Sequence, residues 1–322
     1  MKNPQRILVT GGAGFIGSHL VERLLADGNS VTVIDDCSTG SLDNLRAVLS
    51  HPDLHLIQGK VSESPLHELA ANADFIYHLA AAVGVELVVH SPIRTIETNL
   101  HETEAILRAA GDCGIPLLLT STSEVYGKSQ KPGFDEEDDL IIGPPHLGRW
   151  SYACSKLMDE FLALAYAKEK GLSVIITRLF NTVGPRQTGR YGMVLPRFIA
   201  AAKTGAPLRV YGDGGQTRCF CYVQDTVEAL VRLRKCPTAP GQVFNIGGTD
   251  EISIRELAEL VIRTLGSNSP LALVPYGEAY SAGFQDMLRR KPIVDKLFRT
   301  IQFRPNTELR QIIELTAAAT GK

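Results

Sequence analysis

The sequence predicts an α/β protein whose doubly wound parallel sheet carries helices on both faces. Short, continuous apolar runs alternate with helix-like segments through the first 180 residues, which is the pattern of strands buried on both sides. After Asn181 this alternation gives way to a loop-like stretch and shorter elements, which indicates a smaller C-terminal part. Sheets of this kind bind ligands beyond the carboxyl ends of their strands, so a functional site is expected there.

Each expected strand is a short apolar run bounded by polar or glycine-containing segments. The strands are expected at residues 6–10, 30–35, 54–59, 74–81, 115–121, 172–180 and 243–248. The first helix follows from the helical spacing of Ile16, Leu20 and Leu24. The helices are expected at residues 14–28, 64–73, 91–114 and 151–171. Ser91 and Pro92 suit the N-cap and the first turn of the third helix.

The composition argues against several classes of protein. A net charge of −2 over 322 residues predicts no nucleic-acid partner, which would require a basic face. No apolar stretch is long enough to cross a membrane, and the N-terminus lacks the apolar core of a signal peptide. The six cysteines have no metal-ligand spacing, which predicts no metal site and a reducing, cytoplasmic location.

A glycine-rich turn joins the first strand to the first helix. In "TGGAGFIGSH", Gly11, Gly14 and Gly17 permit a tight turn, close approach of the backbone to a pyrophosphate and close packing of the helix on the sheet. The N–H groups at the start of the helix then face the phosphates, so Phe15 and Ile16 are also expected at the cofactor. The turn therefore predicts a dinucleotide site.

An acidic residue favours NAD at this site. Asp35 ends the second strand about 20 residues beyond the turn, where a carboxylate binds the ribose hydroxyls of NAD and repels the 2′-phosphate of NADP. Asp36 follows it and is either a second cofactor contact or a residue that shapes the loop.

A second motif supplies groups for proton transfer. Tyr152 and Lys156 lie one helical turn apart, so their side chains share a face. An ammonium group lowers the pKa of a neighbouring phenol, which can then act as a general base on a hydroxyl. The stretch "STSEVYG", residues 121–127, follows an apolar strand and adds hydroxyl groups and the carboxylate of Glu124.

Together these motifs resemble the extended short-chain dehydrogenase/reductase family, in its NAD-dependent nucleotide-sugar epimerase/dehydratase branch. The resemblance covers nearly the whole chain and also includes "YHLAA", "RLFNTVGPR" and "VYGDGGQTRCFCYVQD". It implies a Rossmann-type NAD-binding domain at residues 1–180 with a returning segment at about 219–247. The substrate-binding domain is then 181–218 and 248–322. The resemblance also implies a homodimer that oxidises C4 of a nucleoside-diphosphate sugar, with a UDP-sugar favoured.

The resemblance assigns roles to individual residues. Thr122 matches the residue that binds the sugar O4, Tyr152 matches the base, and Lys156 matches its partner. The residues that match the cofactor lining are Leu79, Ala80, Ala81 and Asn99. Those that match substrate contacts are Ser123, Asn181, Arg190, Arg218 and Arg290. Lys60 stands where relatives often carry an aspartate that contacts adenine, so the adenine contact stays open.

Three reactions can follow oxidation at C4, and Glu124 bears on the choice. "Thr-Ser-Glu" resembles UDP-glucuronate decarboxylases, in which a 4-ketone labilises the C6 carboxylate. "RRKP", which contains Arg290, resembles a segment of the same enzymes and could bind that carboxylate. The alternatives are a UDP-hexose 4-epimerase and a nucleoside-diphosphate-hexose 4,6-dehydratase. A non-enzymatic NAD sensor is a further alternative, but such proteins typically lose the Tyr/Lys pair that is present here.

Overall fold

A seven-stranded parallel sheet forms the centre of the molecule. The structure, a computed structural model, describes residues 4–83, 91–189, 193–275 and 287–319. The strand order is β11-β6-β5-β4-β1-β2-β3. The order reverses between β1 and β4, and in open α/β sheets the crevice at this switch point is where ligands bind.

The strands of the sheet confirm the predicted fold class and lie within three residues of the expected bounds. They are β1 (Arg6–Thr10), β2 (Ser30–Asp35), β3 (Leu54–Gln58), β4 (Phe75–His78), β5 (Leu117–Thr122), β6 (Val174–Leu179) and β11 (Gln242–Ile246). The accompanying helices are α1 (Phe15–Ala26), α2 (Leu66–Ala71), α4 (Pro92–Cys113), α5 (Trp150–Lys170) and α7 (Val223–Lys235).

Ser91 precedes α4 as predicted, but its side chain does not cap the helix. Its carbonyl oxygen instead accepts hydrogen bonds from the N–H and the hydroxyl of Thr95, both at 3.0 Å. Pro92 occupies the first turn, where its missing N–H costs nothing.

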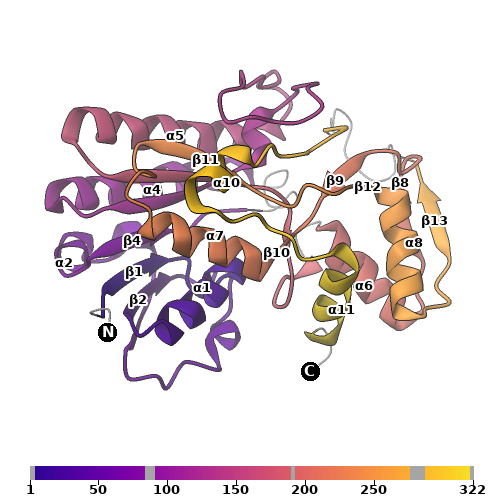
Figure 1. Cartoon of the computed structure of the whole chain (residues 1–322), viewed down its shortest axis with the longest axis horizontal. Helices are drawn as coiled ribbons and strands as arrows, with labels where there is room; N and C mark the ends of the chain where they lie inside the picture. The colour runs from indigo at the N-terminus through magenta and orange to yellow at the C-terminus, as the bar shows by residue number, and fades with distance from the viewer. Residues whose placement is uncertain (1–3, 84–90, 190–192, 276–286, 320–322) are drawn as a thin grey trace.

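Two apolar cores cover the two faces of the sheet. One lies beneath α1 and α7 and includes Leu20, Leu24 and Leu230. The other lies beneath α2, α4 and α5 and includes Ile106 and Leu107. Figure 1 shows α4 and α5 on one side of the sheet and α1 and α7 on the other. The buried strands explain why their sequences are continuous apolar runs.

A third core joins the helices of the C-terminal part. It lies between α6 (Val194–Thr204), α8 (Ile254–Leu265) and α11 (Leu309–Ala319). Three two-stranded sheets accompany these helices: β7 (Thr182–Val183) with β10 (Cys221–Tyr222), β8 (Leu208–Tyr211) with β13 (Leu271–Val274), and β9 (Thr217–Cys219) with β12 (Glu251–Ser253). Leu297, in α10 (Asp295–Ile301), packs instead in the core beneath α1 and α7.

Short 3₁₀ turns follow strands β2, β3 and β5 at their carboxyl ends. They are η1 (Leu42–Leu45), η2 (Val61–Glu63) and η3 (Ser123–Tyr126). Among the described residues, none of the helices has the length and apolarity to cross a membrane.

Candidate active site

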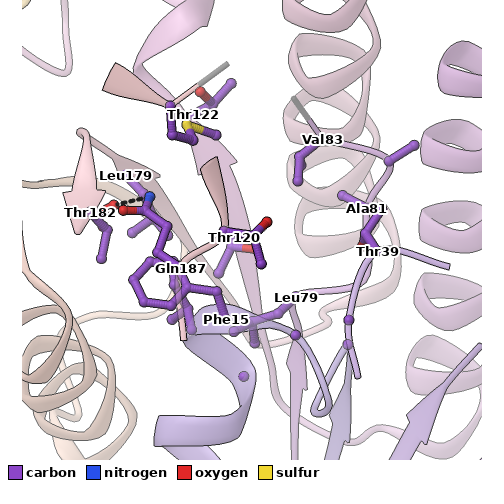
Figure 2. Close-up of a pocket in the computed structure, with 18 of the residues that line it drawn as sticks. Phe15, Thr39, Leu79, Ala81, Val83, Thr120, Thr122, Leu179, Thr182 and Gln187 are labelled. Carbon is purple, nitrogen blue, oxygen red and sulfur yellow. Dashed lines mark hydrogen bonds between the residues drawn. The ribbon is translucent and has the colours of Figure 1, made fainter. Parts of the chain in front are cut away.

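A cavity of about 690 Å³ opens at the carboxyl ends of the sheet strands. Its wall includes the glycine turn, the segment after β4, η3 and parts of the C-terminal region. Figure 2 shows Thr120 and Thr122 above Phe15 and Leu79, with Ala81 and Val83 to their right. The cavity therefore brings together the cofactor motif and the chemical motif.

The glycines of the turn are required by close backbone contacts. A Cβ on Gly17 would lie 2.0 Å from the carbonyl oxygen of Gly11. Gly11 has a φ of +73°, and a Cβ there would lie 2.7 Å from the backbone nitrogen of Ala80. Gly14 is the N-cap of α1. Because Gly14 has no side chain, the first N–H groups of the helix stay uncovered on the side of the cavity. This cradle fits the pyrophosphate of a dinucleotide.

Asp35 is buried at the edge of the same turn. Its carboxylate accepts hydrogen bonds from the N–H groups of Ala13 and Cys37, both at 2.8 Å. Burial raises its pKa, and these backbone donors oppose that effect. Asp35 thus fixes the turn while it lines the cavity. Asp36 is exposed and accepts from the N–H of Ser38, so it shapes the loop and also lines the cavity.

Asn99, on α4, holds the segment after β4 in place. Its side chain accepts from the N–H of Ala82 at 2.7 Å and donates to the hydroxyl of Ser155 at 3.0 Å. The segment that carries Leu79, Ala80 and Ala81 is thereby tied to α5 along the cavity wall.

The end of the cavity beside Lys60 has an arrangement that the sequence did not predict. The ammonium of Lys60 is exposed and pairs with Glu63 at 2.5 Å. Glu102, on α4, is buried and accepts from both the N–H and the hydroxyl of Ser62 at 2.7 Å. The carboxylate near this end of the cavity therefore comes from α4 rather than from the loop after β3.

Thr122 and Tyr152 meet at the end of β5. The Tyr152 hydroxyl hydrogen-bonds Thr122, and the Thr122 Oγ1 also accepts from the N–H of Glu124 at 3.2 Å. Burial and the charge of Glu124 raise the pKa of Tyr152. The ammonium of Lys156 lies one turn further along α5, where it pairs with Asp159.

Glu124 is held between two arginines. Arg290 donates from Nη1 to Glu124 at 2.7 Å and from Nη2 to the hydroxyl of Ser123 at 2.7 Å. Arg149 donates to the other oxygen of Glu124 at 3.2 Å. The nearby guanidinium groups, with that of Arg218, lower the pKa of Glu124 to about 2 despite its burial. The cluster therefore carries a fixed negative charge at neutral pH.

Of the five expected substrate residues, Asn181, Arg218 and Arg290 line the cavity, Ser123 is buried and does not line it, and one is outside the described residues. Asn181 lines the cavity and donates to the carbonyl oxygen of Cys219 at 3.0 Å. Arg218 also lines it, next to Thr217, whose carbonyl oxygen it binds. Arg190 lies outside the described residues. Arg186 lines the cavity with a φ of 72° and pairs with Glu22 at 2.5 Å.

Sequence reasoning missed several cations of the cavity wall. Of the described residues that line it, nine are lysine or arginine and four are aspartate or glutamate. Arg149 lies three residues before Tyr152, a helical spacing that could have revealed it. Arg197 and Arg209 gave no such signal, because they come from α6 and β8 and approach the site through tertiary packing.

No group of three or more His, Cys, Asp or Glu side chains placed to hold a metal ion occurs among the described residues. His78 is a satisfied core residue, with its ring nitrogens bonded to Thr10 at 2.7 Å and Thr103 at 3.2 Å. Burial and the charge of Lys156 lower its pKa to about 3, so the imidazole is neutral.

The geometry defines an NAD-dependent enzyme of nucleotide-sugar metabolism, and the comparisons agree. Residues 7–247 match the NAD dependent epimerase/dehydratase family. The chain belongs to that family. NAD is its cofactor, and the glycine cradle and Asp35 are the residues that fit it.

Relatives of several activities share this architecture. The UDP-N-acetyl-alpha-D-glucosaminuronate decarboxylase of Bacillus cytotoxicus is 42% identical over 97% of this chain and 96% of its own. The UDP-glucuronic acid decarboxylase 1 of Xenopus tropicalis is 37% identical over 98% of this chain and 72% of its own. A solved UDP-glucuronic acid 4-epimerase from Bacillus cereus, in complex with UDP-glucuronic acid and NAD, is 27% identical with a TM-score of 0.88, covering 98% of each chain.

Proposed function

We propose that this enzyme decarboxylates a UDP-linked hexuronic acid. The observation that carries the proposal is the cluster of Glu124, Arg290 and Arg149 beside the hydroxyl of Tyr152. Removal and return of hydride at C4 alone requires no fixed carboxylate at this place, whereas chemistry at C5 and C6 has a use for one. The decarboxylase relatives, at 37–42% identity over nearly the whole chain, support the same reaction.

The arginines suit a substrate with a second negative group. Arg290 lines the cavity, so its guanidinium is placed to attract a sugar carboxylate. Arg149 and Arg290 also offset the repulsion between Glu124 and that carboxylate. The cation-rich wall suits the diphosphate of the same substrate.

The proposed chemistry assigns separate tasks to Thr122 and Tyr152. When bound, NAD supplies a hydride acceptor for C4 and returns the hydride later. Thr122 holds O4, and Tyr152 removes its proton. The resulting 4-ketone makes the C6 carboxylate a β-keto acid, so the bond between C5 and C6 breaks and carbon dioxide leaves. The electron pair stays on C5 as an enolate, and C5 takes up a proton from water. The hydride then returns to C4, and Tyr152 gives its proton back to O4.

The proposal divides the chain between its two ligands. Residues 1–180, with the returning segment 219–247, bind NAD, and residues 181–218 and 248–322 bind the UDP-sugar. The place of β11 within the large sheet and the separate core of α6, α8 and α11 support this division. Asn181, Arg218 and Arg290 contact the substrate from the second part, and Ser123 contacts it from the first.

Product mass tests the function. The protein is incubated with NAD and, separately, with UDP-glucuronate, UDP-N-acetylglucosaminuronate, UDP-glucose and UDP-N-acetylglucosamine. We expect loss of carbon dioxide from a uronate. A uronate of unchanged mass but new configuration would replace the proposal with a 4-epimerase, and loss of water from UDP-glucose would replace it with a dehydratase.

The base is tested separately. Tyr152→Phe should lower turnover by roughly 10²- to 10⁴-fold, the usual contribution of a positioned base. Tyr166→Phe, further along α5, serves as the control and should retain activity. Full activity of the Tyr152 variant would remove Tyr152 from the mechanism.

We also propose that the enzyme is a cytoplasmic homodimer. Met158 and Phe161 on α5 and Ile93 on α4 are large apolar side chains, each more than half exposed. Exposed apolar groups gathered on neighbouring helices favour association. The six cysteines are free thiols, which suits a reducing compartment. Light scattering should give twice the chain mass, and Phe161→Glu should shift it to the mass of one chain.

A further inference from the structure

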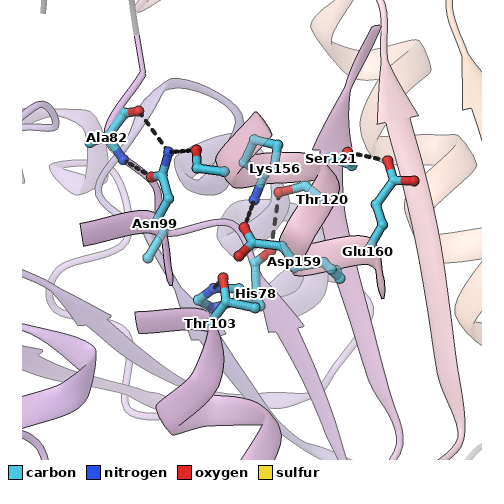
Figure 3. Close-up of polar contacts among 12 residues, drawn as sticks. His78, Ala82, Asn99, Thr103, Thr120, Ser121, Lys156, Asp159 and Glu160 are labelled. Carbon is cyan, nitrogen blue, oxygen red and sulfur yellow. Dashed lines mark hydrogen bonds and ion pairs between the residues drawn. The ribbon is translucent and has the colours of Figure 1, made fainter. Parts of the chain in front are cut away.

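A buried ion pair lies on α5, one to two helical turns beyond the proposed base. The ammonium of Lys156 binds the carboxylate of Asp159 at 2.8 Å, and the side chains are 3% and 1% exposed. Asp159 is three residues beyond Lys156 on α5, so both project from the same face of the helix. Figure 3 shows this pair beside His78 and Thr103, where α5 meets α4 and the end of β4.

The surroundings of Asp159 leave Lys156 as the cation that it faces. Thr103 contributes a hydroxyl from α4, and its hydrogen bond lowers the pKa of Asp159, while burial raises it. His78, from β4, bonds that same hydroxyl and is neutral, so it supplies no charge. Glu160, the next residue on α5, points to Arg178 instead, at 2.8 Å.

The ion pair is linked to the cofactor turn through these neighbours. His78 joins Thr103 to the hydroxyl of Thr10 at the end of β1, at 3.2 and 2.7 Å. The Thr10 hydroxyl also accepts from the N–H of Ala80, at 3.3 Å, in the segment that lines the cavity. A polar chain thus extends from Asp159 to the wall of the NAD site.

We propose that Asp159 is a positioning residue that fixes the Lys156 ammonium and offsets the charge that this ammonium presents to Tyr152. A lone ammonium stabilises the phenolate of a neighbouring tyrosine, and a carboxylate paired with that ammonium cancels part of this effect. Asp159 therefore holds Tyr152 protonated until NAD adds its positive charge. The inference rests on the proposed role of Tyr152 as the base.

Other groups besides Asp159 also affect the pKa of Tyr152. Glu124, from η3, and Asp159 both raise the pKa of Tyr152, whereas Arg290 and the hydrogen bond from Thr122 lower it. Arg149 and Arg290 are themselves bound to Glu124. Because these pairs stay in place when Asp159 is changed, the effect of Asp159 can be measured separately.

Asp159→Asn tests the proposal, since it keeps the shape and removes the charge. The acid limb of the kcat/KM profile should move to lower pH by on the order of one pH unit, because the base then loses its proton more readily. Asp159→Glu should leave the limb near its original pH. Glu169→Gln removes an exposed carboxylate about 25 Å from Tyr152 along the same helix and should not move the limb.

A second measurement needs no substrate. The ultraviolet absorbance of tyrosinate is titrated in the NAD-bound protein, and the titration of the same protein with Tyr152→Phe is subtracted. In the Asp159→Asn protein the signal of Tyr152 should appear at lower pH than in the parent. This result stands even where no uronate is decarboxylated, so failure of the proposed function can be distinguished from failure of this inference.

Thr103→Val supplies an independent variant that leaves all three ionisable groups in place. Loss of the Thr103 hydroxyl raises the pKa of Asp159 and so weakens its negative charge. The acid limb of the kcat/KM profile and the tyrosinate titration should therefore both move in the same direction as in Asp159→Asn, but by less. Reduced thermal stability with unchanged profiles in both variants would overturn the proposal and leave Asp159 as a purely structural partner of Lys156.

Discussion

Glu124 bears on the stability of the protein as well as on its proposed function. It follows a strand whose side chains are all buried, and its own carboxylate is ionised there because Arg149 and Arg290 bind its two oxygens. Both arginines are themselves largely buried, so the three side chains form a compensated cluster rather than a surface ion pair. The cluster can therefore be examined by stability measurements as well as by activity.

The pKa of Glu124 predicts a component of acid unfolding. A folded-state pKa of about 2, below the ordinary value of 4.5, gives stability that is present above pH 4.5 and lost as pH falls toward 2. Its size is about 3 kcal/mol. Glu124→Gln lacks this component, so the difference in free energy of unfolding between it and the parent should shrink over that range. Urea unfolding at a series of pH values measures it.

Glu137→Gln is the control for that experiment, because its carboxylate is 86% exposed. The difference in free energy of unfolding between this variant and the parent should stay nearly constant across the same pH range. A constant difference for Glu124→Gln as well would show that the arginines do not hold Glu124 ionised in the folded protein.

At the scale of elements, the junction of β1 and α1 permits no side chain at Gly17. The carbonyl oxygen of Gly11 occupies the place of a Cβ, so the first turn of the helix lies directly against the strand end. The same closeness brings the N-terminus of α1 to the cavity. Packing and cofactor binding therefore depend on one contact.

Gly17→Ala should destabilise the protein by at least about 1–3 kcal/mol, as overpacked sites do, because backbone must move. It should also weaken NAD binding by more than tenfold, as measured by calorimetric titration. Gly148→Ala, at a position where a Cβ would meet nothing within 4 Å, should change neither quantity. Unaltered NAD affinity in the Gly17 variant would show that this contact does not shape the cofactor site.

The same scale explains what the sequence could and could not predict. The strands and helices of the large sheet were predictable because burial on both faces leaves continuous apolar runs. The turn at Gly17 and the pair Tyr152 and Lys156 were predictable because their spacing is local. Arg197 and Glu102 were not, since their places at the cavity depend on how α6 and α4 pack. Asp159 had the right spacing from Lys156, but burial of the pair is visible in the fold alone.

For the whole molecule, the distribution of charge differs from its sum. The chain has a net charge of −2, yet cations exceed anions by nine to four in the wall of the cavity. A concave, partly buried surface concentrates the field of such an excess. The described wall of the cavity therefore attracts an anionic sugar nucleotide, although the chain as a whole is slightly acidic.

This distribution predicts a dependence on salt. The KM for the proposed UDP-uronate substrate should rise several-fold between roughly 0.05 and 0.5 M sodium chloride, with little change in kcat. Arg209→Gln, in the cavity wall, should raise the KM at low salt and weaken this dependence. Arg46→Gln removes an exposed arginine outside the described lining and should do neither. Identical salt curves for both variants would contradict an electrostatic role of the wall.

The bond between Glu124 and Arg290 joins positions 166 residues apart, and this separation orders events during synthesis. When the ribosome adds residue 290, it has long since synthesised the glycine turn, Asp35 and the Tyr152–Lys156 pair. The strand β11, which completes the large sheet, is also made earlier. The ability to hold the dinucleotide can therefore precede the ability to act on a sugar, and a chain released before position 290 has only Arg149 to balance the charge of Glu124.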